Sequence, residues 1–526
     1  MTKNPGEEVS YKPYAFSLQT LSWITILIIV IMAALYALFG VPPRWNSSTD
    51  AMMYFHSIGI GIAALAVYMV LAIYDLERHE PKLDLPISYR AFAAVLFSAA
   101  GGVFYLPGVA TALAGLGLVL MVFSFVMIGD SGGALFIELF ILPRKLAGVY
   151  DSSHRGGFIA ESVSYIYRII PHTRADFRAF RKMNAAYWLV LASIASALVA
   201  GLIGFSYLWV MYFGSSFFTW YFSLVGLNAG SFLSFGPDPH THEMALSIMA
   251  AVVGLAAAHF GVLNQHGIRQ RVARAGTIVS FAGVIGIIII YAANAFGNWS
   301  PPTLFAGGPG GINGIAGDDL TMSIIALGAM ILLIPLALSP ARRGKIPSWK
   351  DPIRLTFLTT WVLAVISNVV EGFYIETHES LFGAAGAITA PLAANDAVYG
   401  LIQPTFAVYA LTIEALILLA ADCCLSGNVS AKATSGRRIV ATASMIGILA
   451  CGGGMVLWVF TDPAFGGLSS WFFNAGTVIM ALGAIAAAWT IHAQRHHDSS
   501  LLKPRPNRQI SWIDDESFSE AAQRES

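Results

Sequence analysis

The stretch from Ala273 to Phe296 reads ARAGTIVSFAGVIGIIIIYAANAF and carries no charged residue after Arg274. A transmembrane helix needs about 20 predominantly apolar residues, so this segment is long enough to cross a bilayer. The whole chain shares this character, because 56% of its 526 residues are hydrophobic and only 11% are charged. Soluble domains carry roughly a quarter charged residues. The composition therefore predicts an all-α, polytopic integral membrane protein built as a helical bundle.

Twelve segments of the chain satisfy the same length and apolarity requirement. They are residues 18–40, 51–75, 89–106, 108–129, 184–212, 241–264, 273–296, 319–339, 353–375, 396–421, 437–460 and 470–492. The first is longer than the apolar core of a cleavable signal peptide, which has roughly 7–15 residues, and is expected to remain as an anchor. We expect a cytoplasmic segment over 1–17, a twelve-helix membrane domain over 18–492 and a polar, disordered cytoplasmic tail over 493–526.

The basic residues predict the orientation of the chain. When the connections between the twelve spans are assigned alternately to the two sides, every Lys and Arg except Arg44 falls on one side. Basic residues are retained on the cytoplasmic side of a membrane, so both termini are predicted to be cytoplasmic. The expected location is the inner or plasma membrane of a bacterium or archaeon. The Arg-rich loop 143–183 is interpreted either as a segment on anionic lipid or as a solvated connector.

Composition also excludes several classes of protein. Three cysteines in 526 residues cannot form a disulfide framework. Thirty basic and 30 acidic residues cancel, which leaves no overall field for nucleic acid, and no nucleic-acid partner is expected. The sequence contains no HExxH, paired CxxC, Walker loop or CxxCH motif.

Histidines gather near the outer ends of three predicted spans. His56 lies early in the second span, and the sixth span opens with FGPDPHTHEM, residues 235–244. Asp238 suits an N-cap and Pro239 a first helical position, which puts His240 and Glu243 on one face and His242 on another. Two imidazoles and a carboxylate within four residues suit a metal or heme. A polar interfacial helix start is the other interpretation, and for His56 a hydrogen bond to a neighbouring helix is the simpler one.

The ninth span ends with a carboxylate, a phenol and an imidazole on one helical stripe, namely Glu371, Tyr374 and His378. Such a stripe can relay protons or orient a ligand, although an outer helix end is also acidic simply because basic residues are excluded from it. If spans two, six and nine are neighbours, these groups form a single outer-side site. Asp130, Glu138 and Glu414 lie elsewhere and are interpreted either as an inner proton entry or as buried pairs.

Twelve spans, cytoplasmic termini and a histidine early in the second helix resemble subunit I of the heme–copper oxidase and nitric oxide reductase superfamily. In that family the second-helix histidine, here His56, ligates a heme, and a sixth-helix histidine near a glutamate ligates a metal, here His242 or His240 with Glu243. HTHEM is also similar to the HxHEM of the NnrS family of heme- and copper-containing membrane proteins. The chain departs from the superfamily in lacking the histidine pair of helix seven and the HxH of helix ten.

The resemblance implies a membrane redox protein with a reduced outer-side site for b-type heme, copper or both. The expected cofactor ligands are His56, His242 and His378, with His240, His242 and His378 as metal ligands; Glu243, Glu371 and Tyr374 are expected to orient ligands or carry protons. The partners expected for such a redox protein are the lipid bilayer, a periplasmic electron donor or quinol, and further subunits. Its expected substrate is O2 or NO. Two other functions stay open: a proton- or cation-coupled transporter that uses Glu371, Glu414, Asp130 and the histidines, and a non-catalytic anchor subunit.

Overall fold

The computed structural model of the chain describes mainly seven helices and the residues around them. The described residues are 139, 140, 142–144, 147, 149, 171–213, 237–297, 317–341, 346–369, 408, 411, 412, 414–419, 421, 422, 431–460, 472, 475, 476, 479, 480, 482, 483, 486, 487 and 490. Almost all of them are helical, which confirms the predicted all-α class for this part of the chain. The chain divides into two compact units, one comprising residues 1–127, 352–363 and 409–509 and the other comprising 128–351, 364–408 and 510–526.

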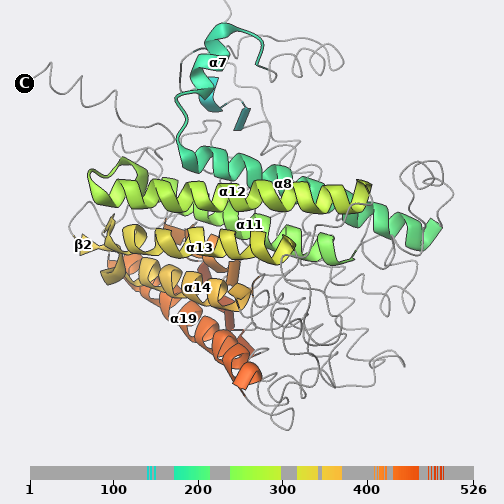
Figure 1. Cartoon of the computed structure of the whole chain (residues 1–526). Coiled ribbons are helices and arrows are strands. Elements are labelled where there is room, and N and C mark those ends of the chain that lie inside the picture. Colours follow the sequence, from blue (N-terminus) through green and yellow to red (C-terminus); the bar gives the residue numbers. More distant parts are fainter. Residues whose placement is uncertain are drawn as a thin grey trace, which may run out of the picture. The chain divides into compact units, whose positions relative to one another are not determined.

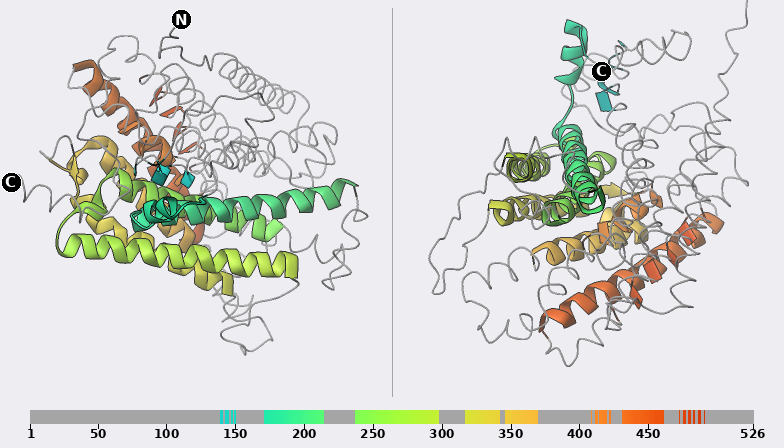
Figure 2. Two further views of the ribbon diagram at one scale, coloured as in Figure 1. Left: turned by 90° about the horizontal axis from the view of Figure 1, so that it is seen from above. Right: turned by 90° about the vertical axis from the view of Figure 1, so that its right-hand side faces the viewer.

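The described part of the second unit contains long helices that pack on one another. Its elements are α7 (Arg174–Phe180), α8 (Ala185–Phe213), α11 (Pro237–His259), η3 (Val262–Asn264), α12 (Ile268–Gly297) and α13 (Gly317–Leu338). The helices α8, α11, α12 and α13 run side by side, with α8 packed on α11 and α12 packed on α13 (Figures 1 and 2). Helix α8 comes close to α11 at Gly254, because a Cβ atom there would lie 2.7 Å from Cγ2 of Val190.

Helix α11 differs at both ends from the segment that the sequence predicts. It begins at Pro237, so Asp238 lies inside the helix and is not its N-cap. Proline suits a first helical position because its missing N–H group needs no partner there, and Pro237 takes the place expected for Pro239. The helix ends at His259, five residues before the predicted end of the span, because Gly261 has a φ of 63° and leads into the turn η3.

Small residues bring α12 and α13 into close contact. A Cβ atom on Gly276 would lie 2.8 Å from the carbonyl oxygen of Gly328, and one on Gly283 would lie 2.6 Å from Cγ1 of Ile325. The hydroxyl of Ser280 donates to the carbonyl of Ile325 between them. Glycine and serine at such positions let two helix backbones approach closely, which is how helices in a bilayer associate.

Large apolar side chains occupy the opposite faces of these helices. On α13, Leu320, Leu327 and Ile334 recur every seven residues, and 56% of Leu327 and 62% of Ile334 is exposed. On α12, Ile278, Ile285 and Ile289 form a similar exposed stripe. In the part of the chain that the structure describes, two helical segments, Ile268–Ala292 and Leu320–Leu338, are long and apolar enough to cross a membrane. A helix that is apolar on its buried and its exposed faces is typical of a membrane span or of a large protein core.

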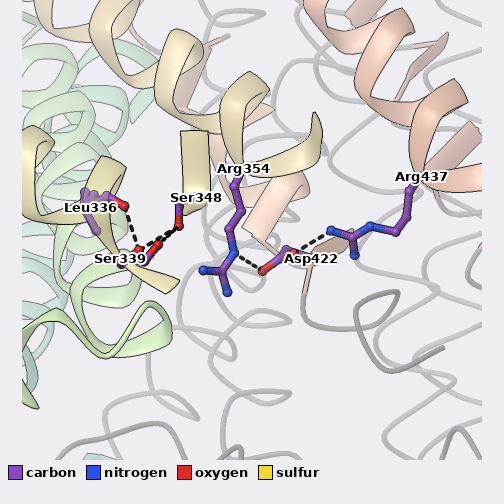
Figure 3. A network of polar contacts seen from close by, with 6 residues as sticks. All are labelled: Leu336, Ser339, Ser348, Arg354, Asp422 and Arg437. Atoms are coloured by element: carbon purple, nitrogen blue, oxygen red, sulfur yellow. Dashed lines mark hydrogen bonds and ion pairs between the residues drawn. The ribbon is translucent and has the colours of Figure 1, made fainter. Parts of the chain in front are cut away.

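A short hairpin follows α13. Strands β1 (Pro340–Ala341) and β2 (Ile346–Pro347) pair antiparallel, with Ala341 opposite Ile346, and η4 (Ser348–Lys350) follows. The serine just before β1 closes the hairpin, because the Ser348 amide donates to the Ser339 carbonyl at 2.8 Å and the two hydroxyls lie 2.7 Å apart (Figure 3). The chain then enters α14 (Pro352–Val369), whose residues 352–363 belong to the other unit.

The unit that includes these first residues of α14 also contains α19 (Ala431–Phe460). Inside it, α19 packs on helical residues of the chain's last described segment, because a Cβ atom on Gly447 would lie 2.7 Å from the backbone nitrogen of Met480. Ile439, Ile446 and Leu449 form an exposed apolar stripe on α19. The unit thus repeats the small-residue packing and the apolar outer surface of α12 and α13.

Helices cover the described parts of the predicted spans 184–212, 241–264, 273–296, 319–339, 353–375 and 437–460, apart from residues 184 and 339 and the end of 241–264. Predicted spans 18–40, 51–75, 89–106 and 108–129 and both termini lie outside the described residues, as do the proposed N-terminal segment and tail. The number of spans and the side of the termini therefore stay predictions.

Candidate functional site

The carboxyl group of Glu243 is buried between two long helices. Glu243 is the seventh residue of α11, and its side chain is 0% exposed. It faces Ser196, the twelfth of the 29 residues of α8, which lies about 16 Å from the start of that helix at 1.5 Å per residue. The sequence predicts Glu243 near the outer end of a span, but its partner lies close to the middle of α8.

Two serine hydroxyls connect Glu243 to α8. The Ser196 hydroxyl donates to Oε1 of Glu243 at 2.9 Å, and the Ser247 hydroxyl lies 2.6 Å from Ser196 Oγ. Ser247 stands one turn after Glu243 and also contacts the Glu243 backbone carbonyl. All three residues are at most 1% exposed. We call Glu243, Ser196 and Ser247 the carboxyl–hydroxyl cluster.

The second carboxyl oxygen, Oε2 of Glu243, is buried and has no hydrogen-bond partner in the described part of the chain. No ion pair among the described residues includes Glu243. A buried carboxylate without a counter-charge is costly, so this position favours a carboxyl group that carries a proton or has a cation beside it.

The geometry of the cluster accommodates either form of the carboxyl group. When Glu243 is ionised, Ser196 donates to Oε1 and Ser247 donates to Ser196. When the proton sits on Oε1, the carboxyl donates to Ser196, Ser196 to Ser247, and Ser247 to the Glu243 carbonyl. Each hydroxyl is a donor and an acceptor, so every hydroxyl finds an acceptor in both states without movement of the helices. The cluster can therefore gain and lose a proton.

The two histidines next to Glu243 in the sequence lie on the same helix as the carboxyl–hydroxyl cluster. His240 and His242 both belong to α11, and the spacing puts His240, Glu243 and Ser247 on one stripe of that helix, with His242 about 100° away from Glu243. The predicted site residues His56, Glu371, Tyr374 and His378 lie outside the described residues. Among the residues that are described, no three His, Cys, Asp or Glu side chains form a group that could hold a metal ion.

Ser196 and Ser247 are functional candidates that the sequence prediction does not include. Ser247 could have been found, because it follows Glu243 by four residues and must share its face. Ser196 could not have been found from the sequence, because it lies 47 positions before Glu243. Only the packing of α8 on α11 brings the two residues together.

A second buried acid lies in the unit that contains α19. Glu414 is 1% exposed, and its Oε1 atom has no hydrogen-bond partner among the described residues. The buried hydroxyl of Ser444, on α19, is the neighbouring polar group, although it does not reach hydrogen-bonding geometry. Asp130 lies outside the described residues, as does Glu138, so the predicted inner proton entry has one described member.

The same unit contains a buried acid that is paired with two arginines. Asp422 accepts a hydrogen bond from Nε of Arg354 at 2.9 Å and from Nη2 of Arg437 at 3.0 Å (Figure 3). Arg354 stands in the first turn of α14 and Arg437 near the start of α19, and all three side chains are buried. The sequence predicts that all three residues lie at span ends on the same side of the membrane. In the structure, the two arginines meet at the carboxylate of Asp422.

A third acid, Asp176, lies at the start of α7. Its carboxylate accepts hydrogen bonds from the amides of His172 and Thr173, the Thr173 hydroxyl caps the helix in return, and Arg144 lies 2.6 Å from Oδ1. Burial by itself would raise the pKa of Asp176. The hydrogen bonds from Thr173 and His172 and the charge of Arg144 outweigh that effect and hold the pKa below its ordinary value.

Low pH is therefore expected to weaken the contacts that Asp176 makes at the start of α7. Because the folded pKa of Asp176 lies below the unfolded one, its stabilising contribution is complete above about pH 4–5 and is lost as the pH falls through the folded pKa. We expect Asp176→Asn to lower the thermal unfolding midpoint at pH 6, and we expect its difference from the parent chain to narrow steadily as the pH falls below about 4. Circular dichroism of both proteins over this range measures the difference, and a difference independent of pH would contradict the assignment.

No protein-family model matches the chain, and no curated protein and no solved structure matches it. The chemistry of the buried groups is therefore the guide to function.

Proposed function

We propose that the chain is an integral membrane protein that couples the movement of a proton or another small cation to transport, with Glu243 as the coupling group. The observation that carries the proposal is the buried Glu243 carboxyl. Its Oε1 atom accepts a hydrogen bond from Ser196, whose hydroxyl is in turn bonded by Ser247, and its Oε2 atom has no hydrogen-bond partner among the described residues. Ionisable groups inside a membrane are costly and usually mark an ion or proton pathway.

The surfaces of the long helices support the membrane part of this proposal. Leu327 and Ile334 on α13 and Ile289 on α12 point away from the packed faces and stay exposed. A row of exposed Leu and Ile side chains suits contact with lipid tails, whereas a water-soluble monomer rarely carries such a surface. We extend this to the full prediction of twelve spans with both termini in the cytoplasm.

The donor atoms of the cluster support a proton or a hard cation as its ligand. Glu243, Ser196 and Ser247 supply oxygen only. Carboxylate and hydroxyl oxygens suit protons and hard cations, whereas copper and heme iron favour imidazole or sulfur ligands. Transport coupled to a proton or cation therefore fits the described side chains better than a redox centre does.

Infrared difference spectra of the purified full-length protein test this proposal. We expect a pH-dependent carbonyl band of a buried protonated carboxyl group, and we expect Glu243→Gln to remove it. Ser196→Ala should shift the band, because it removes the hydrogen bond to Oε1. Ser193→Ala is the matched control: its hydroxyl donates to the Leu189 carbonyl in the same helix, and the band should not move.

Two further measurements extend the test to transport. Sodium added at constant pH is expected to remove the band if the cluster exchanges its proton for a metal cation. In proteoliposomes, potential-driven proton uptake, followed with a trapped pH dye, is expected to be lost in Glu243→Gln and retained in part in Glu243→Asp. An unchanged band in Glu243→Gln, or equal spectra for Ser196→Ala and Ser193→Ala, would overturn the proposal.

The second candidate is the redox function that the resemblance to heme–copper oxidases implies. The specific observation in its favour is that α11 places His240 on the same stripe as Glu243, one turn earlier. Under this proposal His240 or His242 contributes to a site for b-type heme or copper, and electrons come from a periplasmic donor or quinol. A reduced-minus-oxidised spectrum and metal analysis of the same sample decide between the two: a flat spectrum without bound metal excludes the redox function.

A further inference from the structure

The outward surface of α7 carries positive charge only. Four basic side chains in and just after this helix are exposed, namely Arg174, Arg178, Arg181 and Lys182. No ion pair in the described part of the chain includes any of them. The single acid of the helix, Asp176, is 0% exposed, because it caps the first turn and pairs with Arg144. We call the four cations and Phe177 between them the α7 basic surface.

Phe177 is an unusual residue to find among these charges. Phe177 is 56% exposed, and it stands between Arg174 and Arg178 in the sequence of the same helix. Trp188, in the first turn of α8, is also exposed, at 38%. Basic side chains with exposed aromatic rings among them are the composition of segments that lie in the headgroup layer of a membrane.

The α7 basic surface is held firmly at the start of α8. Phe180, at the end of α7, contacts the rings of Phe140, Tyr187 and Trp188 at centroid distances of 5.8–6.3 Å. The Tyr187 hydroxyl donates to the Leu139 carbonyl at 2.6 Å. Figure 1 shows α7 standing clear of the four long helices and joined to the start of α8. The surface is thus a preformed platform beside a helix that we propose to span the membrane.

We propose that the α7 basic surface binds the anionic headgroups of the cytoplasmic leaflet, with Phe177 inserted among them. This inference rests on the proposal that α8 crosses the membrane with Ala185 at its cytoplasmic end. Lipid is favoured over an acidic protein or a nucleic acid because the platform continues into α8, so the bilayer surface lies next to it whenever α8 is inserted. Each Lys or Arg near such a surface strengthens binding about fivefold.

The test uses the full-length chain in nanodiscs. An NBD fluorophore is attached at Phe177→Cys in a background in which the three natural cysteines are replaced by serine. Nanodiscs containing phosphatidylglycerol should give a blue-shifted, brighter signal than nanodiscs of phosphatidylcholine alone. The shift should fade as NaCl rises from 0.1 to 1 M, because the screening length falls from about 10 Å to about 3 Å.

The matched variants separate charge from structure. One variant combines Arg174→Gln, Arg178→Gln, Arg181→Gln and Lys182→Gln, and in it phosphatidylglycerol should no longer change the NBD signal. A second variant, in which the three arginines are replaced by lysine, should keep the response to phosphatidylglycerol. A signal that ignores phosphatidylglycerol and salt, or that responds to added polyuridylic acid or polyglutamate but not to lipid, overturns the proposal. If the chain is instead removed from membranes by alkaline carbonate, the membrane proposal fails separately from this one.

Discussion

Asp422→Asn is expected to destabilise the protein by roughly 3–5 kcal/mol, since the variant leaves two buried arginines without the carboxylate between them. Arg354 and Arg437 both contact Asp422, at 2.9 and 3.0 Å, and all three groups are buried. Asparagine keeps the size of the side chain, but it removes the charge and replaces one of the two acceptor oxygens with an NH2 donor. The thermal unfolding midpoint of the detergent-solubilised chain, followed by circular dichroism, measures the loss.

Two further variants show whether charge is the cause. Arg438→Gln removes the neighbouring exposed cation on α19, and its effect should stay within about 0.5 kcal/mol. A triple variant replaces the whole ion network with apolar side chains, as Arg354→Met, Asp422→Leu and Arg437→Met. It should recover most of the stability lost in Asp422→Asn, because apolar side chains often replace a buried ion network at little cost. Equal midpoints for Asp422→Asn and Arg438→Gln would show that the three residues do not meet as described.

Gly328→Ala is expected to cost about 1–3 kcal/mol, because it forces α12 and α13 apart. A Cβ atom at this position would lie 2.5 Å from the backbone nitrogen of Ser280 and 2.6 Å from the carbonyl oxygen of Gly276. Both neighbours are backbone atoms of α12, so a side-chain rotation cannot relieve the contact. The same unfolding measurement applies, and Gly276→Ala should act in the same direction.

Gly453→Ala is the matched control for this substitution. Gly453 also lies within a helix, α19, but nothing lies within 4 Å of an added Cβ atom. Alanine there should leave the stability unchanged or raise it by about 0.5–1 kcal/mol through helix propensity. If both alanine variants unfold at the same temperature, α12 and α13 do not pack through Gly328.

The sequence predicted the long helices that the structure describes and the places where some of them end. Long apolar segments with at most one charged residue predict α8, α12 and α13, because a backbone in an apolar environment must satisfy its hydrogen bonds internally. The end of α11 was predicted less well, because the apolar composition continues past Gly261 while its left-handed backbone terminates the helix. The predicted site residues His56, Glu371, Tyr374 and His378 lie outside the described residues, and their roles stay predictions.

Only the tertiary structure decided which polar groups meet. The helical period places Glu243 and Ser247 on one face of α11, but it contains no information about which helix that face contacts. Ser196 and Glu243 are 47 residues apart in the sequence, and Arg354 and Asp422 are 68 apart. Both hydrogen bonds form only because separate helices pack together. The physical reason is that apolar faces and small residues allow many pairings of helices, and the shape complementarity of whole helix surfaces selects among them.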